Sequence, residues 1–73
     1  MKFRDNKLIL TEQELNYVKQ ANILSSPYLA GSRLQYLLKN NNLTKDINDT
    51  TDLKFFIECI QSYRSKQYEV VDK

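Results

Sequence analysis

The pattern of apolar positions is clearest between residues 51 and 63. Apolar side chains recur there at three- and four-residue steps, which place them on one face of a helix. This stripe consists of Leu53, Phe56, Ile57 and Ile60. Phe55 and Cys59 recur at the same step but lie on the opposite side, at about 100° per residue. A helix that is apolar on two sides must bury both of them or offer one to a partner.

A first helix is predicted at 12–23 from its start signal. Thr11 and Glu14 have capping-box spacing, in which the hydroxyl accepts from the N3 amide and the carboxylate accepts from the cap amide. Leu10 before the cap and Leu15 four residues after it fit a hydrophobic staple. The two signals together place the first helical residue at position 12.

A second helix is predicted at 27–40. Ser26 is a cap residue, and Pro27 follows at the first helical position, where a missing amide hydrogen costs nothing. The inner face of this helix carries Ala30, Leu34, Leu37 and Leu38. Gly31 borders that face and costs roughly 1 kcal/mol in a helix relative to alanine. Either a close crossing with another helix or a tolerated weakness would explain this glycine. Three asparagines at 40–42 provide residues that accept the left-handed conformation of a helix end.

The two ends of the chain carry β-forming residues. Residues 7–10 read Lys-Leu-Ile-Leu, and residues 68–71 read Tyr-Glu-Val-Val. A pairing of these two segments would close the domain, although a lone two-stranded ribbon is marginal unless a helix covers it. The segment 43–50 between the second and third helices is polar, with Leu43 and Ile47 as isolated apolar anchors.

These elements predict a mainly α fold. We expect a small three-helix domain with helices at 12–23, 27–40 and 52–66, and leave open a short two-stranded β pairing of the N- and C-terminal segments. Thr50 or Thr51 is the expected cap of the third helix. Residues 1–73 form a single domain, because a chain of 73 residues supports one core. One Gly and one Pro argue against an all-β chain, which needs more turn residues.

Composition and charge indicate a soluble globular chain. Hydrophobic residues make up 41% and charged residues 27%, so disorder is not expected. The formal net charge is +2, and no run of basic residues marks a tail or a targeting signal. No apolar segment approaches the ~20 residues of a membrane-spanning helix, and no apolar core follows the N-terminal charges. We therefore expect a cytoplasmic protein with no membrane partner.

The residue types argue against catalysis. The sequence contains no His, one Cys and one Gly, which excludes the commonest general base, a Cys-His pair and a Gly-rich phosphate loop. Asp46, Asp49 and Asp52 follow at three-residue steps but lack the turn glycine and the distal glutamate of a calcium loop. We expect no enzyme activity, no cofactor, no metal and no small-molecule substrate.

The leading functional hypothesis is a small regulatory protein, of the inhibitor or adaptor type, that binds another protein. The residues expected at its interface are Phe55, Cys59, Tyr63 and Tyr36. Aromatic side chains are enriched among interface anchors because they bury a large area at a small entropic cost. Self-association would also cover a two-sided helix, so a homodimer is expected. The competing interpretation makes Phe55 and Cys59 core residues, covered by the N-terminal segment or the C-terminal tail.

The alternative function is a DNA-binding transcriptional regulator. The helices at 12–23 and 27–40, joined by a tight Ser-Ser-Pro connection, have the outline of a helix-turn-helix whose second helix reads the bases. The predicted DNA contacts are Tyr28, Ser32, Arg33, Gln35, Tyr36 and Lys39. Arg33 and Lys39 alone carry charge, which is little for phosphate binding. The competing interpretation is a solvated outer face of an ordinary bundle helix.

Two outlines of DNA-binding proteins are visible. In its serine start and leucine spacing, the run 26–37 resembles the reading helices of winged-helix repressors, but a polar loop and a Phe-rich helix follow in place of a hairpin. A strand at 7–10 before two helices resembles ribbon-helix-helix repressors, with Lys7, Ile9 and Thr11 facing outward. The Lys, Asn and Ile content is typical of an AT-rich coding source, and the small size is typical of accessory proteins of phages and mobile elements.

Overall fold

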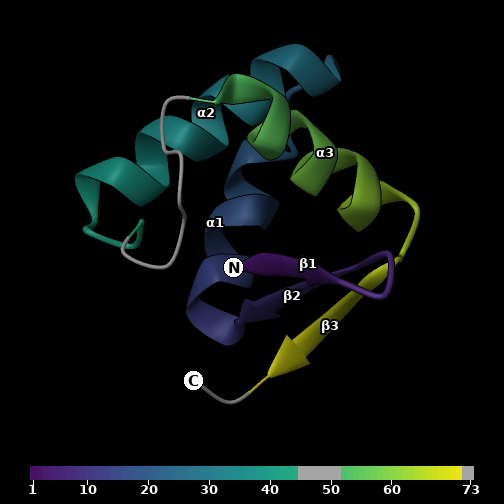
Figure 1. The fold of residues 1–73 in the computed structure, drawn as a ribbon. Coiled ribbons are helices and arrows are strands. Elements are labelled where there is room, and N and C mark those ends of the chain that lie inside the picture. Colours follow the sequence, from purple (N-terminus) through teal and green to yellow (C-terminus); the bar gives the residue numbers. More distant parts are fainter. Residues whose placement is uncertain (45–51, 72–73) are drawn as a thin grey trace.

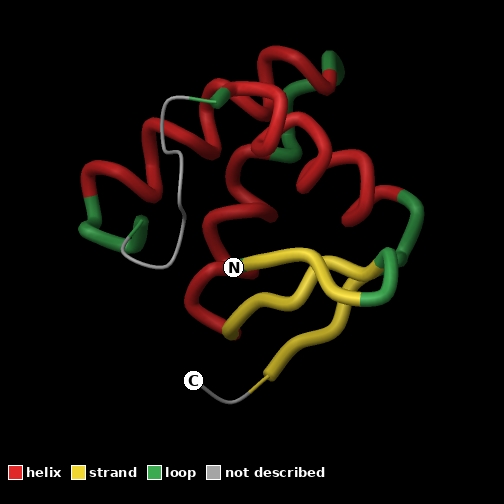
Figure 2. Tube along the Cα trace, in the orientation of Figure 1, coloured by secondary structure: helices red, strands yellow, loops and turns green. Residues whose placement is uncertain are grey.

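The computed structural model describes residues 1–44 and 52–71. Its elements in chain order are β1 (Lys2–Arg4), β2 (Lys7–Thr11), α1 (Glu12–Ala21), α2 (Pro27–Asn40), α3 (Leu53–Arg64) and β3 (Tyr68–Val71). Figures 1 and 2 show the three helices on one side of a three-stranded sheet. The fold is therefore a two-layer α/β arrangement. It contains the three predicted helices and more β structure than the sequence predicted. None of the described helices is long and apolar enough to cross a membrane.

The sheet has the order β1-β2-β3, with β2 in the centre. The pairing of 7–10 with 68–71, which the sequence left open, is present, and these two strands run parallel, whereas β1 and β2 run antiparallel. Leu8 and Leu10 belong to the core under the helices, and Ile9, which strand alternation places on the opposite face, is also buried, so it is not an outward-facing residue available to a partner. Because β2 is paired along both edges, it has no free edge for the dimeric ribbon of a ribbon-helix-helix protein.

Strand β1 is the element that the sequence did not predict. It joins β2 through a hairpin whose turn residues, Asp5 and Asn6, have φ angles of 53° and 64°. Asp and Asn accept this left-handed conformation more readily than other non-glycine residues, and two such residues match the twist of paired strands. The turn places Phe3 opposite Leu8 in the register of the sheet.

Helices α1 and α2 begin as predicted. Thr11 Oγ1 accepts from the Glu14 N–H at 3.2 Å, and Glu14 Oε1 accepts from the Thr11 N–H at 2.8 Å, so the capping box is confirmed. α1 ends at Ala21 rather than at residue 23. α2 has the predicted bounds, with Ser26 as its cap. Asn42 follows its end with a φ of 58°, in the left-handed conformation expected of the asparagine triplet.

Helix α3 is shorter than the predicted 52–66 at both ends. Asp52 is its cap and accepts from the Lys54 N–H at 3.0 Å, while the predicted caps Thr50 and Thr51 lie outside the described residues. Lys66 has a φ of 60°, and the two hydrogen bonds that follow the helix reach back to the Ser62 and Tyr63 carbonyls. This Schellman ending turns the chain from α3 into β3.

Helices α2 and α3 cross closely at Gly31 and Ile57. A Cβ at position 31 would lie 2.8 Å from Ile57 Cγ1 and 2.9 Å from the Ile57 backbone nitrogen. A close crossing is therefore the reason for the glycine. The larger side chains that are fully buried in the core are Leu8, Leu10, Val18, Leu34, Leu38, Phe56, Cys59 and Ile60.

Candidate interaction surface

Helix α2 exposes a broad face on the side opposite the core. It buries Ala30, Gly31, Leu34 and Leu38. Residues at the complementary helical positions are exposed, and these are Tyr28, Leu29, Ser32, Arg33, Tyr36 and Lys39. Tyr28 is 60% exposed, Leu29 54% and Tyr36 58%. This face combines large apolar and aromatic side chains with two cations.

The turn between α1 and α2 extends the apolar character of this face. Ile23 in that turn is 82% exposed, and the next residue, Leu24, is partly buried against the core. Across residues 1–44 and 52–71, six large hydrophobic side chains are exposed, and four of them lie in this turn and on α2. We call the set Ile23, Leu24, Tyr28, Leu29, Arg33 and Tyr36 the α2 surface.

An open hollow lies within the α2 surface. It has a volume of about 480 Å³ and is lined by Leu24, Leu29, Ser32, Arg33 and Tyr36. Leucine and tyrosine side chains form most of its wall, and Arg33 supplies one positive charge. A concave apolar site with a single fixed cation is suited to an apolar side chain that has a carboxylate beside it.

Arg64, in the last turn of α3, holds the α1–α2 turn in place. Its guanidinium donates to Asn22 Oδ1 at 2.6 Å, to the Leu24 carbonyl at 2.6 Å and to the Ser25 carbonyl at 2.9 Å. The planar fork of an arginine suits several acceptors at fixed positions. One side chain therefore ties the turn that carries Ile23 to a different helix.

The residues of α3 that were expected at a protein interface lie mainly against the chain itself. The Phe55 ring meets the rings of Phe3 and Phe56 edge-on, with centroids 5.7 Å and 5.3 Å apart. Phe55 is partly buried against the core, so the N-terminal strand covers much of the side of α3 that we expected a partner to cover. Phe55 keeps some exposed surface, and the homodimer through it stays a prediction.

Cys59 lies inside the core. It is fully buried, and its Sγ donates to Met1 Sδ at 3.5 Å. Burial raises the pKa of the Cys59 thiol from 9.0 to about 12, because a thiolate would lose its hydration there. A side chain with no exposed surface cannot contact a partner, so Cys59 is corrected from an interface residue to a core residue.

Tyr63 and Tyr36 lie in different environments. Tyr63 is partly buried, and its ring packs on that of Tyr68 in β3 with centroids 5.2 Å apart. Tyr36 is exposed on α2. The four residues expected at one protein interface are therefore not brought together, and Tyr36 alone belongs to the α2 surface.

The residues predicted to contact DNA lie closer together than the four residues expected at a protein interface, because all of them are on α2. Tyr28, Ser32, Arg33, Tyr36 and Lys39 are all exposed, and Gln35 is partly buried. Arg33 and Lys39 are the only charged residues of α2, so the helix has no acidic side chain. The same face therefore serves as the candidate surface for either a protein or a DNA partner.

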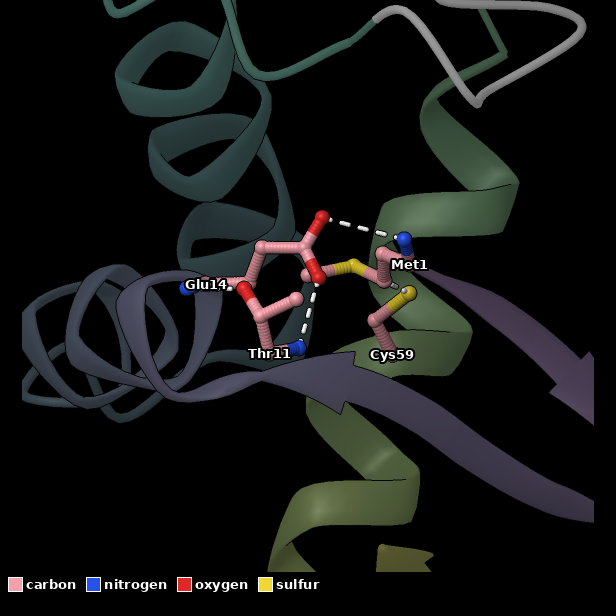
Figure 3. A network of polar contacts seen from close by, with 4 residues as sticks. All are labelled: Met1, Thr11, Glu14 and Cys59. Atoms are coloured by element: carbon pink, nitrogen blue, oxygen red, sulfur yellow. Dashed lines mark hydrogen bonds and ion pairs between the residues drawn. The ribbon is translucent and has the colours of Figure 1, made fainter. Parts of the chain in front are cut away.

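A buried ion pair that sequence reasoning missed lies at the start of α1. The Met1 ammonium donates to Glu14 Oε2 at 3.0 Å, while Glu14 Oε1 accepts from the Thr11 N–H (Figure 3). The Met1 side chain is enclosed and the Glu14 side chain is nearly so. The capping-box spacing predicted the hydrogen bond that one carboxylate oxygen of Glu14 accepts from the Thr11 N–H. Nothing local in the sequence predicted that the other oxygen pairs with Met1, thirteen residues away.

A second, larger hollow lies between the β1–β2 hairpin and α3. Its volume is about 860 Å³, and its lining is Phe3, Arg4, Asp5, Asn6, Glu58, Gln61, Ser62, Ser65 and Gln67. The side chains are mostly polar and none of them is buried. In the described ranges, no group of three or more His, Cys, Asp and Glu side chains is placed to hold a metal. Asp46 and Asp49 lie outside these ranges, and Asp52 caps α3.

No family model, curated protein or solved structure matches this chain.

Proposed function

We propose that this chain is a small non-enzymatic regulatory protein, of the inhibitor or adaptor type, that binds another protein through the α2 surface. The observation that carries the proposal is the exposure of Ile23 in the α1–α2 turn together with that of Tyr28, Leu29 and Tyr36 on α2. Its size and its Lys, Asn and Ile content favour an accessory protein of a phage or mobile element.

The energetics of these side chains support a protein partner. Removing one exposed Leu or Ile side chain from water stabilises a complex by up to about 1.5–3 kcal/mol before ordering costs are subtracted. Tyrosine and arginine are the residue types most enriched among strong interface contacts, and the α2 surface has two tyrosines and one arginine. Leu24 and Leu29 line the hollow at its centre, as apolar anchors do in interfaces.

A second copy of the chain is a poor occupant of the α2 surface. In a symmetric dimer the same patch lies on both subunits. Arg33 and Lys39 from both copies would then enter one interface to which α2 contributes no acidic side chain. Like charges placed together in this way cost binding energy, so a different protein is favoured over a homodimer.

Leu29→Asp tests the proposal. This change places a carboxylate in the apolar centre of the α2 surface while leaving the buried positions of α2 intact, so the fold is retained. Capture of a host protein from nuclease-treated lysate should be lost, with circular dichroism and oligomeric state unchanged. A tag belongs at the C-terminal end in this experiment, because the Met1 amine is buried against Glu14.

Gln13→Asp is the matched control. It adds the same charge at an exposed position of α1, about 12 Å along the helix from Ala21, where α1 ends before the turn that carries Ile23. The control should capture the same protein as the wild type. Equal capture by Leu29→Asp and the wild type would refute the use of the α2 surface.

The second candidate function is a DNA-binding regulator that uses the same helix. The observation in its favour is that α2 has two cations and no acidic residue, with five of the six predicted contacts exposed. This version predicts salt-sensitive binding to duplex DNA that the double variant Arg33→Ala, Lys39→Ala loses. An absence of duplex binding at low salt would rule it out.

A further inference from the structure

We propose that the partner presents an acidic amphipathic helix, which sets an apolar side chain in the hollow of the α2 surface and pairs a carboxylate with Arg33. This inference rests on the proposed function and names the chemistry of its partner. It joins three observations, which are the hollow, the charge of α2 and the fixed position of the α1–α2 turn.

The shape of the hollow favours a helix that contributes one or two side chains. Leu24 reaches the hollow from the turn, whereas Leu29 and Tyr36 reach it from positions about two helical turns apart on α2. A helix that lies along such a groove places anchors at three- and four-residue steps, which matches the spacing of the exposed positions on α2. Tyr28 and Ile23 lie outside the lining and offer further apolar contact at its edge.

The charge of the surface favours an acidic occupant. Arg33 lines the hollow itself, and Lys39 lies on the same exposed face of the helix. α2 has no carboxylate with which either cation would pair. A partner carboxylate beside the apolar anchor would form a bidentate, charge-assisted hydrogen-bonded pair with the Arg33 guanidinium. A basic occupant would instead place like charges together.

The α1–α2 turn is held in place before any partner binds. Arg64 donates to Asn22 and to the carbonyls of Leu24 and Ser25, so the turn does not have to be ordered on association. A partner therefore avoids part of the entropic cost that a loose loop would impose. Arg64 is a positioning residue for the surface, because it acts through the turn and does not line the hollow.

Two other occupants fit less well. Duplex DNA presents phosphates and base edges, whereas Ile23 and Leu29 are exposed aliphatic side chains, which can neither donate nor accept a hydrogen bond. A second copy of the chain would bring Arg33 against Arg33 or Lys39 of its counterpart. The experiment below distinguishes both of these occupants from the proposed one.

The test uses two synthetic helical peptides of about 20 residues that share one leucine stripe. One peptide has glutamates flanking the stripe, and the other has lysines at the same positions. Each is titrated into the isotope-labelled 73-residue chain, and backbone amide shifts are followed by NMR. The acidic peptide should shift the amides around Leu24, Leu29, Arg33 and Tyr36, and should bind at least about tenfold more tightly than the basic one.

Variants separate the apolar from the ionic contact. Leu29→Asp should abolish the shifts, and Arg33→Gln should weaken binding of the acidic peptide about tenfold and reduce its salt dependence. Lys54→Gln is the control, since it removes a cation from the exposed side of α3 and should leave binding unchanged. The inference is overturned if the acidic peptide causes no shifts at about millimolar concentration, if both peptides bind equally, or if Arg33→Gln binds like the wild type.

Failure of this inference differs from failure of the proposed function. If Leu29→Asp abolishes capture of a host protein while charge on the peptide has no effect, the α2 surface binds a protein of another chemistry. If duplex DNA shifts the same amides and the acidic peptide does not, the DNA-binding candidate replaces both. If the chain dimerises through this face, dilution will move the same amides without any added peptide.

Discussion

Gly31 and Ile57 approach so closely that no side chain fits between α2 and α3 at this point. A Cβ at residue 31 would lie 2.8 Å from Ile57 Cγ1, and its next two neighbours would be Ile57 backbone atoms, the nitrogen at 2.9 Å and Cα at 3.0 Å. Backbone atoms inside a helix cannot move aside as the end of a flexible side chain can. The close crossing also fixes how α2 lies on α3, and with it the direction in which the outer face of α2 points.

Gly31→Ala is therefore expected to destabilise the protein, although alanine is the better helix former. The helix propensity of alanine favours the variant by roughly 1 kcal/mol. The clash with Ile57 forces the two helices apart, and overpacking of this kind typically costs about 1–3 kcal/mol. A lower urea midpoint in equilibrium unfolding would show that the clash outweighs propensity. A raised midpoint would mean that the helices separate at little cost.

The Phe3–Phe55 contact is expected to couple β1 to α3. Removing either ring should destabilise the fold, and an edge-on aromatic pair contributes about 0.5–1.5 kcal/mol beyond its buried area. The measurement is a double-mutant cycle in urea with Phe3→Ala, Phe55→Ala and the double variant. A coupling energy near zero would contradict the assignment of Phe55 as a partner of β1. Both single variants should still bind through the α2 surface at temperatures where they are folded.

The helices could be predicted because their signals are local. The Thr11–Glu14 spacing and the Ser26–Pro27 pair act within a few residues, so α1 and α2 begin where the sequence indicates. The two end segments were recognised as β-forming from their residue types. They pair as β2 and β3, and the helices provide the cover that such a ribbon requires.

The candidate surface could be predicted only in part, because burial on α3 depends on contacts distant in the chain. The sequence left open whether a partner or the ends of the chain cover Phe55 and Cys59, and the structure places Phe3 against Phe55 and Met1 against Cys59. Tyr36 and Arg33 were named from their outward helical positions, which is a local property. The role of Arg64 has no sequence signal, because its three acceptors lie about forty residues earlier in the chain.

Arg64→Lys is expected to loosen the α1–α2 turn with a modest effect on global stability. A lysine retains the charge but cannot donate to Asn22, Leu24 and Ser25 at once. Because these hydrogen bonds are exposed to solvent, the global cost should be about 1 kcal/mol or less. Hydrogen exchange at residues 22–26 should accelerate, and binding through the α2 surface should weaken. Unchanged exchange in this turn would show that Arg64 does not hold it.

Cys59 is expected to make the stability of the fold fall at alkaline pH. Its pKa is raised to about 12 by burial, from 9.0 when the thiol is exposed. Because the folded pKa is the higher one, the contribution is complete below about pH 9 and is lost as the pH rises towards 12. The decline attributable to this thiol is up to about 1.4 kcal/mol per pH unit.

Cys59→Ala isolates that contribution from the tyrosines and lysines, which titrate over the same range. The variant should be less stable than the wild type near neutral pH, because a small cavity replaces the sulfur. The difference between the two free energies of unfolding should shrink as the pH rises above about 9. A difference that stays constant through this range would mean that the thiol ionises as readily in the folded protein as in the unfolded chain.

Glu14→Gln should reveal the energetic weight of the buried pair between Met1 and Glu14. The amide oxygen of glutamine still accepts from the Thr11 N–H, so the capping interaction can be kept. The Met1 ammonium, by contrast, loses its carboxylate while it remains buried, and breaking a buried pair in this way costs about 3–5 kcal/mol. Acetylating the Met1 amine in the wild type should also destabilise, because it removes the charge from the other side of the pair. In the Glu14→Gln background the same acetylation should cost much less, since the ammonium no longer has a carboxylate to lose. Equal costs of acetylation in both backgrounds, measured by urea unfolding, would show that the ammonium and Glu14 do not interact in the folded protein.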